Sequence, residues 1–176
     1  ISSGTTVLGT KKITFYSTTV AKITTIVNHG IIVSGANAAD ALGYGAVTAT
    51  VVDADGFPIA NKTVVATSSA PTSVGLTNAT ATTDTYGEAT FLVTGGVVVG
   101  SALITVATGT LATAAGYVAA APVSVRRGTA TVAKYAMSLD KSSYLPGEIA
   151  TLTILLTDSL GLPVADGGAL TITSLT

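Results

Sequence analysis

The sequence of 176 residues has no cysteine and no tryptophan, and it has one histidine and one methionine. The lack of cysteine excludes disulfide frameworks, thiolate zinc sites and cysteine nucleophiles. Only 10% of the residues are charged, and eight Lys and Arg residues face nine Asp and Glu residues. Such a balanced charge gives no basic field for phosphates, so the composition argues against nucleic acid as a partner.

Hydrophobic residues make up 48% of the chain, and threonine is the most frequent residue, followed by alanine, valine and glycine. An apolar, weakly charged chain can bury enough surface to fold, and β-branched residues favour strands. Alternating apolar residues between turn signals predict seven short strands, so we expect an all-β antiparallel sandwich. The expected strands span residues 22–27 with 31–33, 46–53, 62–67, 77–82, 88–94, 102–108 and 123–131.

The same alternation predicts which side chains form the core. The expected inward-facing residues are Val47, Ala49 and Val51 or their neighbours, Phe91, Val93, either Leu103 or Ile104, and Val106. Turn chemistry predicts a positive φ at Gly56, Gly87 and Gly161, and a hydrogen bond that the Asp84 side chain accepts from its own downstream backbone.

No charged residue lies between Glu88 and Arg126, so residues 95–122 superficially resemble a membrane-spanning helix. Glycine and threonine interrupt this stretch, and residues 103–108 alternate with the period of a strand. The pattern therefore predicts a strand, a loop and a second strand, with no membrane span.

An internal repeat divides the chain. Residues 46–61 (AVTATVVDADGFPIAN) align with residues 151–166 (TLTILLTDSLGLPVAD), so that Gly56 and Gly161, 105 residues apart, occupy the same turn. A second match, TVAK at 19–22 and 131–134, has an offset of 112 residues. The difference of seven residues implies a longer opening segment in the first copy, around residues 29–41.

The repeat predicts three parts. Residues 1–22 are expected to be the last strand of a preceding unit and a linker, residues 23–133 one complete sandwich, and residues 134–176 the first three strands of a following unit. The third of these strands is expected over residues 169–174. The sequence is thus interpreted as a segment of a longer tandem array.

Two stretches resemble a known family. Residues 51–64 contain an Asp-x-x-Gly-x-Pro turn, and residues 82–91 contain Thr-Thr-Asp-x-x-Gly-x-Ala. Both are similar to the bacterial immunoglobulin-like domains found in tandem in invasin- and intimin-type adhesins and in surface-layer proteins. Residues 139–148 resemble the Asp-Lys-x-x-Tyr-x-Pro-Gly-Glu opening of surface modules. The resemblance implies tandem immunoglobulin-like sandwiches in a protein of the cell surface.

Catalytic chemistry has little support in the sequence. A nucleophile–histidine–acid arrangement would need His29, which lies in the turn-like tripeptide Asn28-His29-Gly30 with no acid marked by a motif nearby. The few acidic residues lie mostly in turns, which disfavours a pair of catalytic carboxylates. We therefore expect no enzyme activity, no catalytic residues and no cofactor other than a candidate calcium ion.

Calcium is the candidate metal. Asp53 and Asp55 flank a turn and are candidate ligands, and Asp40 or Asp84 are candidates to join them. The alternative is that these aspartates cap turns, because no Asp-x-Asp-x-Asp-Gly loop is present. Asn61 and Asn78 begin the sequons Asn-Lys-Thr and Asn-Ala-Thr and are candidate N-glycosylation sites.

The expected function is that of a non-enzymatic structural module in an extracellular, self-assembling surface protein, either a surface layer or a filament. Low charge favours self-association, so the expected partners are copies of the same protein. Two alternatives stay open. One is an adhesin stalk or binding domain that contacts a cell-surface glycan or a host protein through residues 95–122. The other is an accessory domain of a secreted enzyme.

Overall fold

The computed structural model describes residues 2–3, 6–7, 17–28, 30–32 and 46–165. In these ranges every regular element is a strand, and none of them contains a helix long and apolar enough to cross a membrane. The expected longer opening segment around 29–41 and the strand expected over 169–174 lie largely or entirely outside the described residues. The all-β prediction is confirmed.

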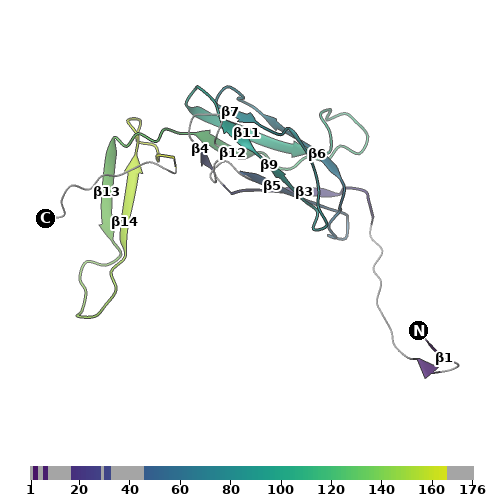
Figure 1. Ribbon diagram of the computed structural model, residues 1–176, viewed down its shortest axis with the longest axis horizontal. Coiled ribbons are helices and arrows are strands. Elements are labelled where there is room, and N and C mark those ends of the chain that lie inside the picture. The colour runs from purple at the N-terminus through teal and green to yellow at the C-terminus, as the bar shows by residue number, and fades with distance from the viewer. Residues whose placement is uncertain (1, 4–5, 8–16, 29, 33–45, 166–176) are drawn as a thin grey trace.

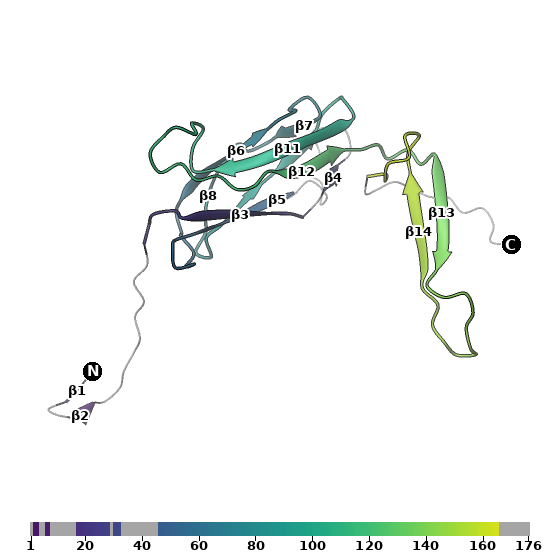
Figure 2. The ribbon, with the colours of Figure 1, turned by 180° about the vertical axis from the view of Figure 1, so that it is seen from behind.

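Two sheets pack face to face, as Figures 1 and 2 show. The first sheet has the order β3 (Lys22–Val27), β5 (Val47–Val52) and β9 (Glu88–Phe91), and all its pairs are antiparallel. The second sheet has the order β4 (Ile31–Ile32), β12 (Val123–Arg127), β11 (Gly100–Ala107), β6 (Thr63–Ser68) and β8 (Thr80–Thr82). Only the β4–β12 pair is parallel. The predicted sandwich is therefore observed.

The core lies between the two sheets and consists mainly of small aliphatic side chains around Phe91. The inward-facing residues predicted from alternation are buried, and of the two candidates at the start of β11, Ile104 is buried and Leu103 is exposed. On β5 the structure decides between the two alternatives, because Val47, Ala49 and Val51 are buried and their neighbours are only half-buried. Because aromatic residues are only 5% of the chain, many aliphatic contacts provide the stability.

Two predicted strands differ in the structure. The strand expected over 88–94 is divided into β9 and β10 (Val93–Gly95). Of the strand expected over 77–82 only β8 forms, and β7 (Val74–Leu76) precedes it where no strand was predicted. β7 pairs with β10, whereas β8 and β9 join opposite sheets. Asn78 explains the breaks, because its Oδ1 accepts from Leu92 N at 2.6 Å and its Nδ2 donates to Thr90 O at 3.1 Å.

A separate hairpin follows the sandwich. β13 (Lys134–Leu139) and β14 (Leu152–Thr157) pair antiparallel, and Figure 1 shows them beside the end of the sandwich that β12 leaves. Near the N-terminus, β1 (Ser2–Ser3) and β2 (Thr6–Val7) form a short antiparallel pair. The division into a preceding strand, a complete sandwich and an opening hairpin stays a prediction.

Candidate functional site: the joint between sandwich and hairpin

The turn after β5 is built around the Asp53 carboxylate. Its Oδ1 accepts hydrogen bonds from the backbone N–H groups of Asp55 and Phe57, at 3.0 and 2.9 Å, and its Oδ2 accepts from Ser17 N at 3.0 Å. Burial alone would raise the pKa of Asp53, but the hydrogen bonds from backbone N–H groups outweigh burial and lower it. Asp53 thus ties the turn to the linker that precedes the sandwich.

The repeat reproduces this turn after β14. Asp158 Oδ1 accepts from the backbone N–H groups of Leu160 and Leu162, each at 2.9 Å, which are the positions equivalent to Asp55 and Phe57. Gly56 and Gly161 both have positive φ, of 83° and 76°. Their predicted conformation is confirmed, and the same local sequence produces the same turn.

The linkers in front of the two turns are also alike. Thr19 N donates to Ser17 Oγ and Thr131 N donates to Thr129 Oγ1, each at 3.0 Å. The next backbone contacts agree as well, because Ala21 N donates to Val52 O at 3.0 Å and Ala133 N donates to Thr157 O at 2.9 Å. The two linkers therefore enter their hairpins in the same way.

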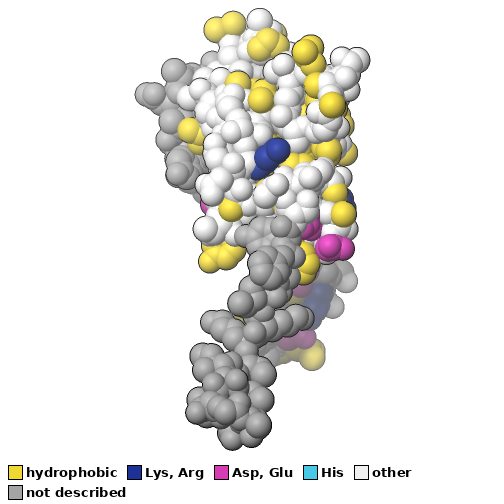
Figure 3. Space-filling model, turned by 90° about the vertical axis from the view of Figure 1, so that its right-hand side faces the viewer, with side chains coloured by type: hydrophobic (Ala, Val, Ile, Leu, Met, Phe, Trp, Pro, Cys, Tyr) yellow, Lys and Arg dark blue, Asp and Glu magenta, His cyan; other side chains and the backbone are white. Residues whose placement is uncertain are grey.

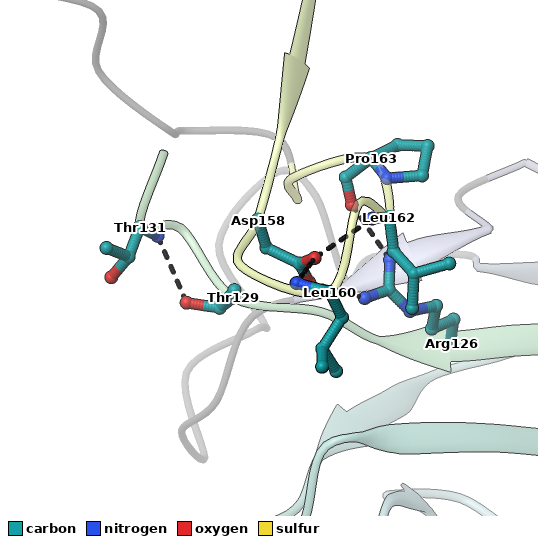
Figure 4. Close-up of polar contacts among 7 residues, drawn as sticks. All are labelled: Arg126, Thr129, Thr131, Asp158, Leu160, Leu162 and Pro163. Atoms are coloured by element: carbon teal, nitrogen blue, oxygen red, sulfur yellow. Dashed lines mark hydrogen bonds and ion pairs between the residues drawn. The ribbon is translucent and has the colours of Figure 1, made fainter. Parts of the chain in front are cut away.

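The second turn has one partner that the first lacks in the described residues. Arg126, near the end of β12, donates through Nη2 to Asp158 Oδ2 and through Nη1 to the backbone oxygen of Pro163, both at 2.8 Å (Figure 4). The Arg126 side chain is 12% exposed and that of Asp158 is 2% exposed. Charge-assisted hydrogen bonds of this kind are stronger than neutral ones.

The pKa of Asp158 lies below its ordinary value. The backbone hydrogen bond from Leu162 is the largest cause, and the Arg126 guanidinium lowers the pKa further, while burial opposes both. The carboxylate is therefore ionised across the neutral range and holds the guanidinium of the sandwich against the turn of the hairpin.

Backbone contacts close the joint around this ion pair. Ala165 N donates to Thr129 O at 3.0 Å, and Gly128 N donates to Ile32 O at 2.8 Å. A Cβ atom on Gly128 would lie 2.8 Å from Ile31 Cγ2 and 3.4 Å from the Cβ of Ala165, which is itself buried. A side chain here would force Ile31 to shift and would press on Ala165, so the hairpin and the sandwich approach closely. We call this set of contacts between Arg126, Gly128, Thr129, Asp158, Pro163 and Ala165 the joint.

The candidate calcium ligands Asp53 and Asp84 each use side-chain oxygens within their own turn. Asp53 turns its oxygens toward backbone N–H groups, and Asp84 does so too, since its Oδ1 accepts from Tyr86 N and Glu88 N. Asp55 is exposed, and Asp40 lies outside the described residues, as does His29. No group of three or more potential metal ligands is found in the described part of the chain. These contacts favour the turn-capping interpretation, and calcium binding stays a prediction.

The two glycosylation candidates differ in their surroundings. Asn61 is exposed and has a positive φ of 57° at the turn before β6. Asn78 is half-buried, and both ends of its amide are used in the hydrogen bonds that divide the strands. Of the two predicted sites, Asn61 is the more accessible to modification.

The stretch that resembles a surface-module opening forms the loop between β13 and β14. Tyr144 Oη donates to Asp140 Oδ1 at 2.6 Å, and Glu148 accepts from Lys141 Nζ at 3.1 Å and from Leu145 N at 2.9 Å. Hydrogen bonding to Tyr144 is the main reason why the pKa of Asp140 is lowered. The side chains of Asp140, Tyr144 and Glu148 therefore stabilise the loop to which they belong.

Sequence reasoning missed Arg126 as a functional residue. The repeat contained the signal, because Asp158 is the equivalent of Asp53, and Arg126 aligns with Thr14 at the 112-residue offset. The signal was a turn acid that recurs in the repeat, together with a charged residue at the end of the unit where the preceding copy has an uncharged one.

No protein-family model matches the sequence, and no curated protein matches it either. Among solved structures, the chain matches "Structure of surface layer protein SbsC, domains 4-9", with a TM-score of 0.41 and 20% identity. The match covers 89% of this chain and 23% of that chain, so this chain spans less than a quarter of its length.

Proposed function

We propose that the chain is a non-enzymatic structural module of an extracellular, self-assembling surface protein in which sandwiches are joined in tandem. Residues 1–22, 23–133 and 134–176 are the end of one unit, a complete unit and the opening of the next. The joint is the observation that supports this proposal most. Its ion pair, its backbone hydrogen bonds and its close contact at Gly128 fix one unit against the next, as a load-transmitting array requires.

The proposed sandwich type is immunoglobulin-like. The first strand is split between the two sheets, because β3 pairs with β5 in the first sheet while β4 runs parallel to β12 in the second. The sheet order β12-β11-β6 opposite β3-β5-β9 agrees with this architecture. These features support the resemblance of residues 51–64 and 82–91 to tandem surface domains.

The surface of the sandwich suits contacts between copies. On the face in Figure 3 most of the described surface is uncharged, with hydrophobic side chains scattered over it and few charged groups. A weakly charged surface lets copies approach without electrostatic repulsion. Self-assembly into a layer or a filament is the proposed use of this surface.

The test combines two measurements on native material. Intact mass and terminal sequencing should give a polypeptide much longer than 17.2 kDa, and electron microscopy should show a lattice or filaments. A native polypeptide of only 17.2 kDa would contradict the tandem array. Dispersed single particles under assembly conditions would contradict self-assembly.

A binding domain of an adhesin is the second candidate, and one surface feature favours it. The side chains of Val97, Val98 and Val99 are exposed on the loop before β11, beside the joint, where Arg127 Nε donates to Gly96 O at 3.1 Å. An apolar loop on a rigid base is a suitable contact for a cell-surface glycan or a host protein. Single stalks in electron microscopy, without a lattice, would favour this candidate.

A further inference from the structure

The hairpin β13–β14 has the same pairing as β3–β5. Lys22 pairs with Val52 and Val27 with Val47 in the first hairpin, and the equivalent pairs in the second are Lys134 with Thr157 and Leu139 with Leu152. All six pairs of each ladder correspond at the offsets of the repeat. Each residue of β13–β14 therefore has a counterpart whose surroundings are known.

The two hairpins differ in what covers them. Ile23 and Val47 point into the core of the sandwich and are 4% and 0% exposed. Their counterparts Tyr135 and Leu152 are 61% and 49% exposed. We define the inner face of β13–β14 by the counterparts of the core-facing positions of β3 and β5: Tyr135, Met137, Leu139, Leu152, Ile154 and Leu156. All six are hydrophobic.

Such a face is unusual at a surface, because apolar residues at alternate positions of two paired strands form a continuous patch. In the complete sandwich the second sheet covers the equivalent patch, with fully buried Val64 on β6, Ile104 on β11 and Val125 on β12. A strand edge is free as well. β9 pairs with Val47–Thr50 of β5 in the sandwich, whereas in the described residues the equivalent edge of β14 has no partner.

The joint fixes the point from which the chain continues after the turn. Ala165 is buried and its N–H is bonded to Thr129 O, so the chain is fixed where it leaves the turn. Its counterpart Ala60 leads within three residues to β6, the strand that starts the covering sheet of the sandwich. The strand predicted over 169–174 is the equivalent of β6.

We propose that the inner face is one half of a second core, and that its occupant is the polypeptide following Ala165, folded as a covering sheet with an added edge strand at β14. This rests on the tandem arrangement proposed above and names the partner of the hairpin as the same chain. A second copy of the protein is the competing occupant. The two occupants predict different results for monomers. A covering sheet from the same chain stays on the inner face when assemblies are separated into monomers, whereas a second copy leaves it.

Met137 is a natural probe, because it is the only methionine in the sequence and lies on the inner face, half exposed. The rate at which hydrogen peroxide oxidises a methionine increases with its exposure. Peptide mass spectrometry of Met137 oxidation therefore reports whether the inner face is covered. We expect Met137 to oxidise about tenfold more slowly in monomers of the native polypeptide than in the 176-residue chain. Equal rates would overturn the proposal. Protection only in assembled material would also overturn it, in favour of a second copy.

A pair of variants of the native polypeptide tests the face itself. Ile154→Lys puts a charge on the inner face and should restore fast oxidation of Met137, whereas Thr153→Lys, on the opposite face of the same strand, should leave it slow. Equal behaviour of the two variants would contradict the assignment of faces. Electron microscopy of the same samples distinguishes the proposal of a second core from the proposal of self-assembly. A protected Met137 in samples without a lattice or filament would contradict self-assembly and leave the second core supported.

Discussion

The hairpins β3–β5 and β13–β14 have the same pairing, the same turn and the same entry from their linkers, but one is buried and the other is exposed. The hydrogen bonds of Asp53 and Asp158 to the second and fourth residues after them agree within 0.1 Å. Local sequence therefore determines the ladder and the turn. Burial depends on strands far away in the sequence, which only the first hairpin has among the described residues.

The largest expected effect comes from truncating equivalent residues of the two hairpins. Ile23→Ala should lower the free energy of unfolding by about 2–5 kcal/mol, because it leaves a cavity in the core. Tyr135→Ala in the 176-residue chain should change it by less than about 0.5 kcal/mol, because its side chain is mostly exposed. Urea unfolding followed by far-UV circular dichroism measures both. Similar losses would show that the second hairpin is already packed.

Two glycines with positive φ separate local turn formation from packing. Gly87, with φ of 74°, leaves only 2.7 Å between an added Cβ and Val51 O, whereas an added Cβ at Gly56 meets nothing within 4 Å. Gly56→Ala should cost about 1–2 kcal/mol for its left-handed backbone. Gly87→Ala should cost about 2–5 kcal/mol, because a cost of overpacking is added.

The same urea experiment compares the two alanine variants. Equal costs would mean that the backbone around Gly87 moves away from the new methyl group. A larger cost at Gly56 would contradict the packing argument altogether, since both variants share the backbone cost and differ only in the space around the Cβ atom.

The sequence allowed the prediction of several features that depend on neighbouring residues. Alternation identified the buried face of β9 and reduced that of β5 and β11 to two alternatives, and turn chemistry identified the positive φ of Gly56, Gly87 and Gly161. The positive φ of Asn61 was missed. The breaks at Thr77 and Leu92 were missed because Asn78 replaces backbone partners across a gap of 14 residues. The joint was missed because Arg126 and Asp158 are 32 residues apart and meet only after both parts have folded.

The joint gives a third, smaller effect, on orientation rather than on stability. Arg126→Met removes the bonds to Asp158 and to Pro163 O but keeps an aliphatic side chain. The hairpin should then take a wider range of orientations, because linked units move relative to one another unless their interface is extensive. The chain has no cysteine, so the substitutions Thr90→Cys and Ser138→Cys give two specific sites for spin labels. The distribution of distances between the two labels reports the range of orientations of the hairpin.

We expect the distribution to become about twofold broader in Arg126→Met, since the ion pair is lost while the contacts of Ala165 with Thr129 and Gly128 remain. Arg127→Met is the matched control, because Arg127 Nε bonds to Gly96 O within the sandwich. Equal broadening in both variants would mean that the loss of charge at the end of β12, and not the joint, loosens the hairpin.

Acid provides the smallest and most selective change. The pKa values of Asp53 and Asp158 are lowered in the folded chain, so the stabilisation from their hydrogen bonds is complete above the unfolded-state pKa of about 3.9. It is lost as the pH falls through the lower folded-state values. Between about pH 5 and 7 neither group should therefore change the stability or the joint.

The two aspartates should respond to acid in different measurements. Protonation of Asp158 removes the ion pair with Arg126, so the spin-label distribution of the unsubstituted chain should broaden as the pH falls through the lowered pKa of Asp158. In Asp158→Asn the distribution should be broad at every pH, whereas Asp53→Asn should keep the acid broadening, because Asp53 ties the other linker at Ser17. If the distribution of Asp158→Asn still broadens in acid, another carboxylate causes the pH dependence. The ion pair would then not be what makes the joint rigid.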